Sequence, residues 1–114
     1  MNDALIGTSL KDVGRDIQQL TRENKKLERK LNTMGTPSDT DSFRMELRDD
    51  IHQTTALVKH LLSCIQDLKS QEPDNNVSMK LQRAEKQFLD QYTKLSNLTK
   101  RIKLGLESSQ PSHG

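Results

Sequence analysis

The sequence predicts an all-α protein, an elongated antiparallel up-down-up bundle of three helices. Three segments carry apolar residues at alternating spacings of three and four, two short breaks containing Gly or Pro separate them, and no segment shows the alternation of a strand. Only 31% of the 114 residues are hydrophobic, so a core requires that these residues form narrow stripes. We expect the bundle over residues 8–106, between a flexible N-terminal segment (1–7) and a flexible tail (107–114).

The first helix is predicted over about residues 8–34. Its stripe holds Leu10, Val13, Ile17, Leu20, Leu27, Leu31 and Met34, with Asn24 in the one polar place. This spacing keeps one face of a helix turned toward a partner helix.

The stretch after this helix contains residues that end the first helix and residues that begin the second. Gly35 can take the left-handed conformation that closes a helix, and Pro37 disfavours helical geometry at Thr36. Thr40 or Asp39 can then cap the next helix. Because the connection is short, we expect the first and second helices to be antiparallel neighbours.

The second helix is predicted over about residues 41–70. Its stripe comprises Leu47, Ile51, Thr54, Val58, Leu61, Ile65 and Leu68. Leu57, Leu62 and Cys64 widen this stripe on both flanks. Such breadth is typical of a helix that packs between two neighbours, so we expect this one to be the middle helix.

The third helix is predicted over about residues 77–105. Pro73 ends the preceding helix, and Asp74, Asn75 or Asn76 can cap the next one. Its stripe comprises Val77, Leu81, Ala84, Phe88, Gln91, Leu95, Leu98 and Ile102. Gly105 is a candidate terminator.

Each stripe contains one polar residue near its middle. Antiparallel pairing about the two breaks brings Asn24, Thr54 and Gln91 to one level. We expect a hydrogen-bonded layer that fixes the register of the helices, because a buried amide without a partner costs about 1 to 3 kcal/mol. The alternative is that the stripes drift in phase and leave one or more of these residues at a wet boundary.

A second feature is apolar but lies off the stripes. Leu89, Tyr92 and Leu106 fall on one flank of the third helix, and Leu62 falls on the flank of the second. These four residues are candidates for a groove that binds an amphipathic partner helix. The alternative is that Tyr92 covers the edge of the core with its hydroxyl group in water.

Motifs for catalysis and for ion binding are missing from the sequence. There is no Gly-rich phosphate loop, no HExxH and no nucleophile elbow. We expect no enzyme, no catalytic residue, no metal and no cofactor. The single Cys64, beside Leu61 and Ile65, indicates an ordinary packing residue more than a reactive thiol.

Basic residues cluster at two places, but the net charge is only +2, too little to indicate a nucleic-acid binder. The clusters are Arg22, Lys25, Lys26, Arg29 and Lys30, and Lys100, Arg101 and Lys103. They are interpreted as solvated helix faces; the alternative is contact with acidic headgroups or an acidic partner.

The stretch "LNTMGTPSDTDSFRMEL" resembles the join between the first two helices of the N-terminal domain of syntaxins, in the endosomal and vacuolar branch. The matching residues are Leu31, Gly35, Thr36, Pro37, Asp39 and Arg44, with Phe43 where Leu is usual. The segment "FLDQYTKLSNLTKR" is similar to the closing part of that domain. It matches at Phe88, Tyr92, Leu95, Leu98 and Arg101.

The resemblance implies a three-helix Habc domain, a non-catalytic module of a Qa-SNARE that regulates SNARE assembly. Its implied partners are SNARE helices, in cis in a longer parent or in trans, and Sec1/Munc18-like proteins. The implied location is the cytosolic face of endosomal or vacuolar membranes. The fusion helix and the membrane anchor of the family would lie outside these 114 residues. The chain is then either an excised domain or a short product. We expect a monomer. The alternative is a structural three-helix repeat or a coiled-coil oligomerisation module.

Overall fold

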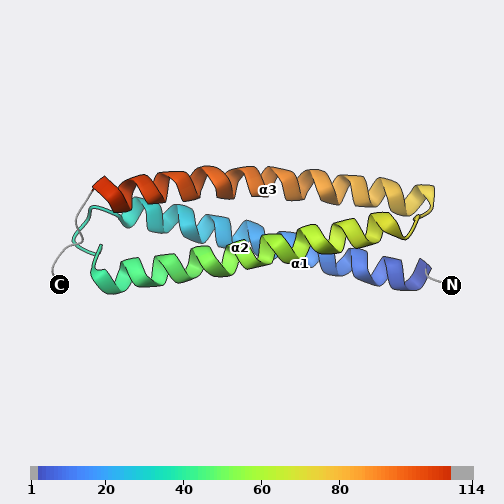
Figure 1. Cartoon of the computed structure of the whole chain (residues 1–114), viewed down its shortest axis with the longest axis horizontal. Coiled ribbons are helices and arrows are strands. Elements are labelled where there is room, and N and C mark those ends of the chain that lie inside the picture. The colour runs from blue at the N-terminus through green and yellow to red at the C-terminus, as the bar shows by residue number, and fades with distance from the viewer. Residues whose placement is uncertain (1–2, 109–114) are drawn as a thin grey trace.

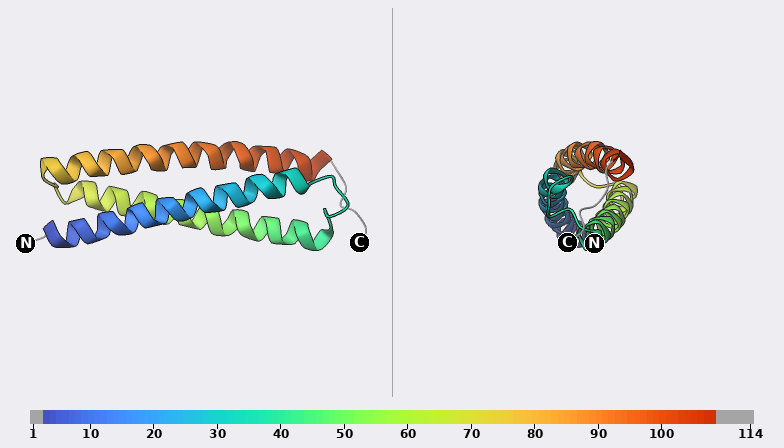
Figure 2. Two further views of the ribbon diagram at one scale, coloured as in Figure 1. Left: turned by 180° about the vertical axis from the view of Figure 1, so that it is seen from behind. Right: turned by 90° about the vertical axis from the view of Figure 1, so that its left-hand side faces the viewer.

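Three helices lie side by side in the part of the chain that the structure describes (Figure 1). The computed structural model describes the backbone of residues 3–108 and the side chains of residues 9–107. Within this part of the chain, the helices are α1 (Asp3–Thr33), α2 (Asp41–Ser70) and α3 (Asn75–Ser108), and there is no strand. α2 runs antiparallel to the other two, which are parallel to each other (Figure 2). The rod measures 59 × 19 × 17 Å, which confirms the predicted elongated up-down-up bundle.

The observed helix boundaries differ from the predicted ones mainly at the two ends of the chain. α2 covers the predicted residues 41–70. α1 begins at Asp3, so residues 3–7 are helical where a flexible segment was expected, because Ala4 and Leu5 favour a helix and no proline interrupts them. At the other end, residues 107 and 108 of the expected tail are still helical, and residues 109–114 lie outside the described residues.

α3 begins earlier and ends later than the sequence predicts. The carboxylate of Asp74 accepts a hydrogen bond from the backbone N–H of Val77 at 2.8 Å, so the helix begins at Asn75. Gly105 does not end it. A Cβ atom at this position would lie 2.6 Å from the Cε atom of Met34, so the flexible tip of the Met34 side chain rests over Gly105.

The three predicted stripes meet in one continuous core. Among the side chains that the structure describes, fourteen apolar ones are buried there. They are Val13, Ile17, Leu20, Leu27, Leu47, Val58, Leu61, Ile65, Leu68, Leu81, Phe88, Leu95, Leu98 and Ile102. α1 contacts both other helices extensively, whereas α2 and α3 contact each other much less. The helix packed between two neighbours is therefore α1, and the prediction that α2 is the middle helix is wrong.

Candidate functional site

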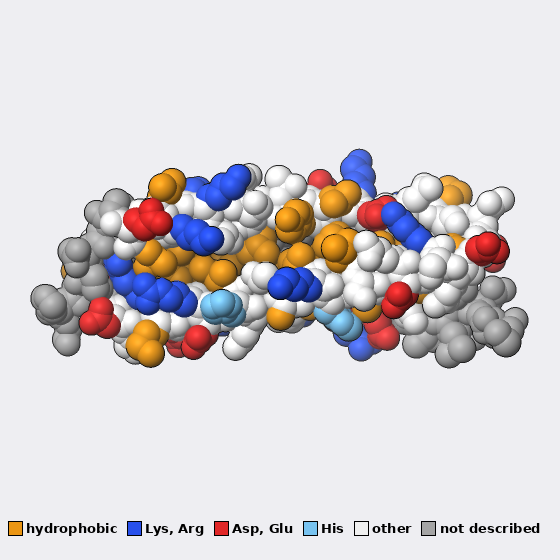
Figure 3. Space-filling model, viewed as in Figure 1, with side chains coloured by type: hydrophobic (Ala, Val, Ile, Leu, Met, Phe, Trp, Pro, Cys, Tyr) orange, Lys and Arg blue, Asp and Glu red, His pale blue; other side chains and the backbone are white. Residues whose placement is uncertain are grey.

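The sparse contact between α2 and α3 leaves a groove along the bundle. A cavity of about 330 Å³ opens there. It is lined by Thr55, Val58, Lys59, Leu62, Phe88, Leu89 and Tyr92. Figure 3 shows apolar side chains gathered in a strip along this side of the molecule. A strip of accessible apolar surface therefore lies at the interface that the three helices close least well.

Three side chains present most of the accessible apolar surface of this groove. Leu62 is 45% exposed, Leu89 is 52% exposed and Tyr92 is 47% exposed. Phe88 is buried and stacks with the Tyr92 ring, with 6.2 Å between the ring centroids. Leu62 and Leu89 each follow a core residue directly, and this places them about 100° round the helix from the core, on the flank. The structure thus places three of the four predicted groove residues together.

Leu106, the fourth predicted groove residue, lies elsewhere. It is fourteen residues beyond Tyr92, which is about 21 Å along the helix. Its side chain is partly buried against the core, near the end of the bundle. Periodicity gave the correct flank of α3 for Leu106 but not its distance along the axis, so Leu106 does not belong to this groove.

Two of the three predicted layer residues are hydrogen-bonded to each other. The Asn24 side-chain amide donates to the backbone oxygen and to the Oε1 atom of Gln91, both at 3.0 Å. Asn24 is completely buried, and its own Oδ1 atom has no hydrogen-bond partner. The contact joins α1 to α3 across the core, and it leaves one buried acceptor unsatisfied.

Thr54 is buried but does not join this contact. Its hydroxyl group donates to the backbone oxygen of Asp50, one turn earlier in α2, at 2.7 Å. A Thr hydroxyl within a helix commonly bonds in this way to its own backbone, which removes the need for a partner on another helix. The expected three-residue layer is therefore wrong in this respect, and the contact is a pair.

The corner between α1 and α2 contains the predicted end of the first helix and the predicted cap of the second. Gly35 has a φ of +82°, the left-handed conformation. Thr40 is the cap of α2, and its hydroxyl accepts a hydrogen bond from the Phe43 N–H at 3.2 Å. Pro37 lies in the short turn between them, after Thr36.

Asp39 has a different role from the cap that was considered for it. Its carboxylate is fully buried and accepts a hydrogen bond from the Gly35 N–H at 2.8 Å. It also accepts two from the Arg44 guanidinium, Nε to Oδ1 at 2.8 Å and Nη2 to Oδ2 at 2.9 Å. The Arg44 hydrogen bond is the main cause that lowers the pKa of Asp39, and the Gly35 N–H adds to it. The carboxylate is thus held in its charged form.

Arg44 connects this corner to the end of α3. It is 95% buried, and its Nη1 atom lies 3.5 Å from the backbone oxygen of Leu106. Sequence reasoning did not find the pair with Asp39, although there was a signal. Arg44 lies seven residues before Ile51, so it occupies a stripe position. A charged residue at a stripe position needs a buried partner, and Asp39, five residues earlier and just before the helix, is an acidic residue within reach.

The remaining candidates for chemical activity are the Cys64 thiol and groups of residues that could bind a metal ion. Burial raises the pKa of the Cys64 thiol, and the neighbouring Asp16 raises it further, so the reactive thiolate is disfavoured. Its Sγ atom lies 3.5 Å from Nε2 of His60. In the described part of the chain, no group of three or more His, Cys, Asp or Glu residues is placed to hold a metal ion.

The comparisons with known proteins point to one family. A family model described as syntaxin-like protein matches residues 9–110, nearly the whole chain. No curated protein and no solved structure gives a significant match. Of the helices described, none is long and apolar enough to cross a membrane. The three-helix fold and the match together show that the chain belongs to the syntaxin-like protein family, as a SNARE-related Habc domain.

Proposed function

We propose that this domain is a regulatory and docking module of an endosomal or vacuolar syntaxin-like SNARE, which controls SNARE assembly and recruits trafficking partners in vesicle fusion. The family match supports a SNARE-related role in general. The observation that carries the finer proposal is the apolar groove between α2 and α3, with Leu62, Leu89 and Tyr92 about half exposed.

The proposed occupant of the groove is an amphipathic SNARE helix. A fourth helix would place its apolar face on Leu62, Leu89 and Tyr92 and so cover the interface that α2 and α3 leave open. Full burial of one such side chain contributes about 1.5 to 3 kcal/mol, and here only the exposed half of each remains to be buried. Binding of this size is reversible, so the groove would delay SNARE assembly by competition without making or breaking a bond.

The setting of this activity follows from the same proposal. The SNARE helix would belong to a longer parent in cis, or to another SNARE in trans, and Sec1/Munc18-like proteins are the other class of partner. The domain would work at the cytosolic face of endosomal or vacuolar membranes, held there by an anchor elsewhere in the parent. The coiled-coil alternative has no supporting observation, since the three stripes already close one core within a single chain.

A binding titration tests the groove. A fluorescent peptide with the sequence of an endosomal syntaxin SNARE helix is titrated with the wild-type domain and with the Leu89→Ser/Tyr92→Ser variant. Because the variant loses two apolar contacts at the centre of the groove, we expect its affinity to fall at least about tenfold.

The matched control is Met45→Ser/Met79→Ser. Both methionines are more than half exposed, and neither lines the groove. We expect this control to bind like the wild type, with the helicity of all three proteins equal by circular dichroism. Equal affinity of the groove variant and the wild type would refute the docking site.

A further inference from the structure

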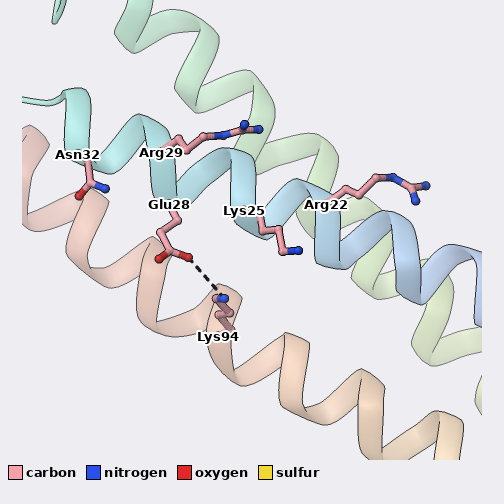
Figure 4. A pocket seen from close by; sticks show the side chains of 6 residues that line it. All are labelled: Arg22, Lys25, Glu28, Arg29, Asn32 and Lys94. Atoms are coloured by element: carbon pink, nitrogen blue, oxygen red, sulfur yellow. Dashed lines mark ion pairs between the residues drawn. The ribbon is translucent and has the colours of Figure 1, made fainter.

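The basic segment of α1 is divided by the fold into two groups with different surroundings. Lys26 and Lys30 face α2, where both ammonium groups pair with the carboxylate of Asp50, which is 10% exposed. Lys25 lies instead on the side of α1 toward α3, and Arg22 and Arg29 extend into solvent, away from α3 (Figure 4). One run of basic residues in the sequence thus forms an interhelical ion pair on one side and an exposed cationic surface on the other.

The exposed group surrounds a shallow hollow between α1 and α3. Its volume is about 580 Å³. It is lined by Arg22, Lys25, Glu28, Arg29, Asn32 and Lys94. The Glu28 carboxylate and the Lys94 ammonium reach toward each other across it, 3.4 Å apart. We call this surface the basic hollow.

The charge of the basic hollow is not balanced from within. Glu28 and Lys94 offset each other, which leaves the three cations of α1. Arg22 donates a hydrogen bond to the uncharged Gln19 at 2.7 Å, and among the described residues none of the three cations has an ion-pair partner. The hollow therefore attracts negative charge.

The chemistry of the lining limits what can bind there. All six lining side chains are polar or charged, so an amphipathic helix would find no apolar side chain to pack against, only the aliphatic stems of charged ones. The large apolar side chains that are exposed in the described region all lie on α2 and α3. The hollow therefore has no apolar residue to insert into a bilayer, and its concave shape suits a chain that enters it better than a flat surface.

We propose that the basic hollow docks an acidic, extended segment of a partner protein. Arg22, Lys25 and Arg29 are separated by three and four residues, about 4.5 and 6 Å along the helix axis. Alternate side chains of an extended chain are about 6.6 Å apart on one side, a spacing close enough that the long, flexible Arg and Lys side chains can reach carboxylates at every second position of the segment. The two guanidinium groups can each bind a carboxylate through two hydrogen bonds.

Binding at the basic hollow is independent of the proposed SNARE-helix groove, because the two surfaces share no lining residue. Exposed ion pairs each contribute little, so the segment binds weakly and its affinity falls as the salt concentration rises. Such a contact adds to an interaction made elsewhere on the same partner.

The test uses a fluorescein-labelled peptide of alternating Glu and Ser, with a Gln and Ser peptide as the uncharged reference. Fluorescence anisotropy measures binding to the wild-type domain and to two charge-reversed variants. The first is Lys25→Glu/Arg29→Glu in the hollow. The second, the matched control, is Lys80→Glu/Lys86→Glu on α3, where both lysines are exposed and neither lines the hollow.

The two variants change the net charge of the domain equally. A difference between them therefore distinguishes binding at the basic hollow from general electrostatic attraction of the peptide to the domain. We expect the hollow variant to lose at least about tenfold in affinity for the acidic peptide and the control to stay within about threefold. Equal losses in the two variants, or equal binding of the Glu and Gln peptides, would overturn the proposal. Sedimentation of the domain with phosphatidylserine vesicles, without binding of the acidic peptide, would overturn it in favour of a membrane.

Discussion

Two buried polar contacts hold this bundle in different ways, one at the corner between α1 and α2 and one in the middle. At the corner, Asp39 and Arg44 form a charged pair in which both carboxylate oxygens accept hydrogen bonds. In the middle, Asn24 donates twice to Gln91, but its own Oδ1 atom accepts nothing. The corner contact is charged, and both oxygens of its carboxylate are hydrogen-bonded. The middle contact is neutral, and one of its buried acceptors has no hydrogen bond.

This difference predicts opposite responses to substitution. Removing one partner of a buried ion pair leaves a charge without compensation in a poorly solvated place, and that is costly. Replacing both members of a neutral buried pair by apolar side chains of similar size is nearly neutral or stabilising, because no polar group remains unpaired. The corner should therefore dominate stability, and the middle should act mainly on how uniquely the helices align.

The largest effect is expected for Arg44→Met. The methionine keeps much of the volume of Arg44 but leaves the buried Asp39 carboxylate with only the Gly35 N–H. We expect the free energy of unfolding, measured by urea denaturation, to fall by about 3 to 5 kcal/mol. The control is Arg48→Met, an exposed neighbour on the same helix, which should change little. A loss below about 1 kcal/mol in Arg44→Met would mean that the corner pair does not stabilise the fold.

Acid should weaken the same corner. The folded-state pKa of Asp39 lies below its unfolded value, so the carboxylate stabilises the fold above about pH 4, the unfolded value. This stabilisation is lost as the pH falls from there through the folded-state pKa. We therefore expect wild type to be more stable than Asp39→Asn at neutral pH, and the difference to shrink as the pH falls below about 4.

The measurement is urea unfolding of both proteins at a series of pH values. Asp49→Asn, at an exposed carboxylate of the same helix, is the control and should follow the wild type at every pH. A gap between wild type and Asp39→Asn that does not depend on pH would show that the charge of Asp39 is not what stabilises the corner.

The parts of the fold that sequence predicted well are those set by local chemistry. The bounds of α2, the left-handed Gly35 and the Thr40 cap each depend on residues within a few positions of one another. The pairing of Asp39 with Arg44 was missed because its cause is tertiary, the burial of both groups beside the end of α3. Local sequence indicates a cap at Asp39, and the resemblance includes both Asp39 and Arg44 without pairing them; in the structure the Asp39 side chain is buried against Arg44.

Distance along the axis was the other limit. Heptad spacing placed Leu62, Leu89 and Tyr92 on facing flanks, and the structure brings them together. Heptad position alone puts Tyr92 and Leu106 on one flank of α3, and the fourteen residues between them, about 21 Å along the axis, are what separates them. Heptad position also cannot show that the Thr54 hydroxyl bonds to the backbone of its own helix, nor that the Met34 side chain lies over Gly105.

The smallest change in stability, and the most informative for the middle contact, is expected for Asn24→Leu/Gln91→Leu. Both leucines continue their stripes, and the unsatisfied Oδ1 atom disappears, so the free energy of unfolding should stay unchanged or rise by about 1 kcal/mol. We propose that the cost appears in register, because polar core residues can specify one alignment of helices that apolar residues do not.

That proposal is tested by sedimentation equilibrium and by amide hydrogen exchange on the double variant. The wild type should be a monomer of 13.0 kDa. In the double variant, a fraction of higher oligomer or faster exchange in the middle of α1 and α3 would show a loss of unique alignment despite equal stability. A monomer with exchange rates like those of the wild type would instead mean that the apolar stripes alone set the register. The contact with Gln91 would then serve only to satisfy the amide donor of the buried Asn24 side chain.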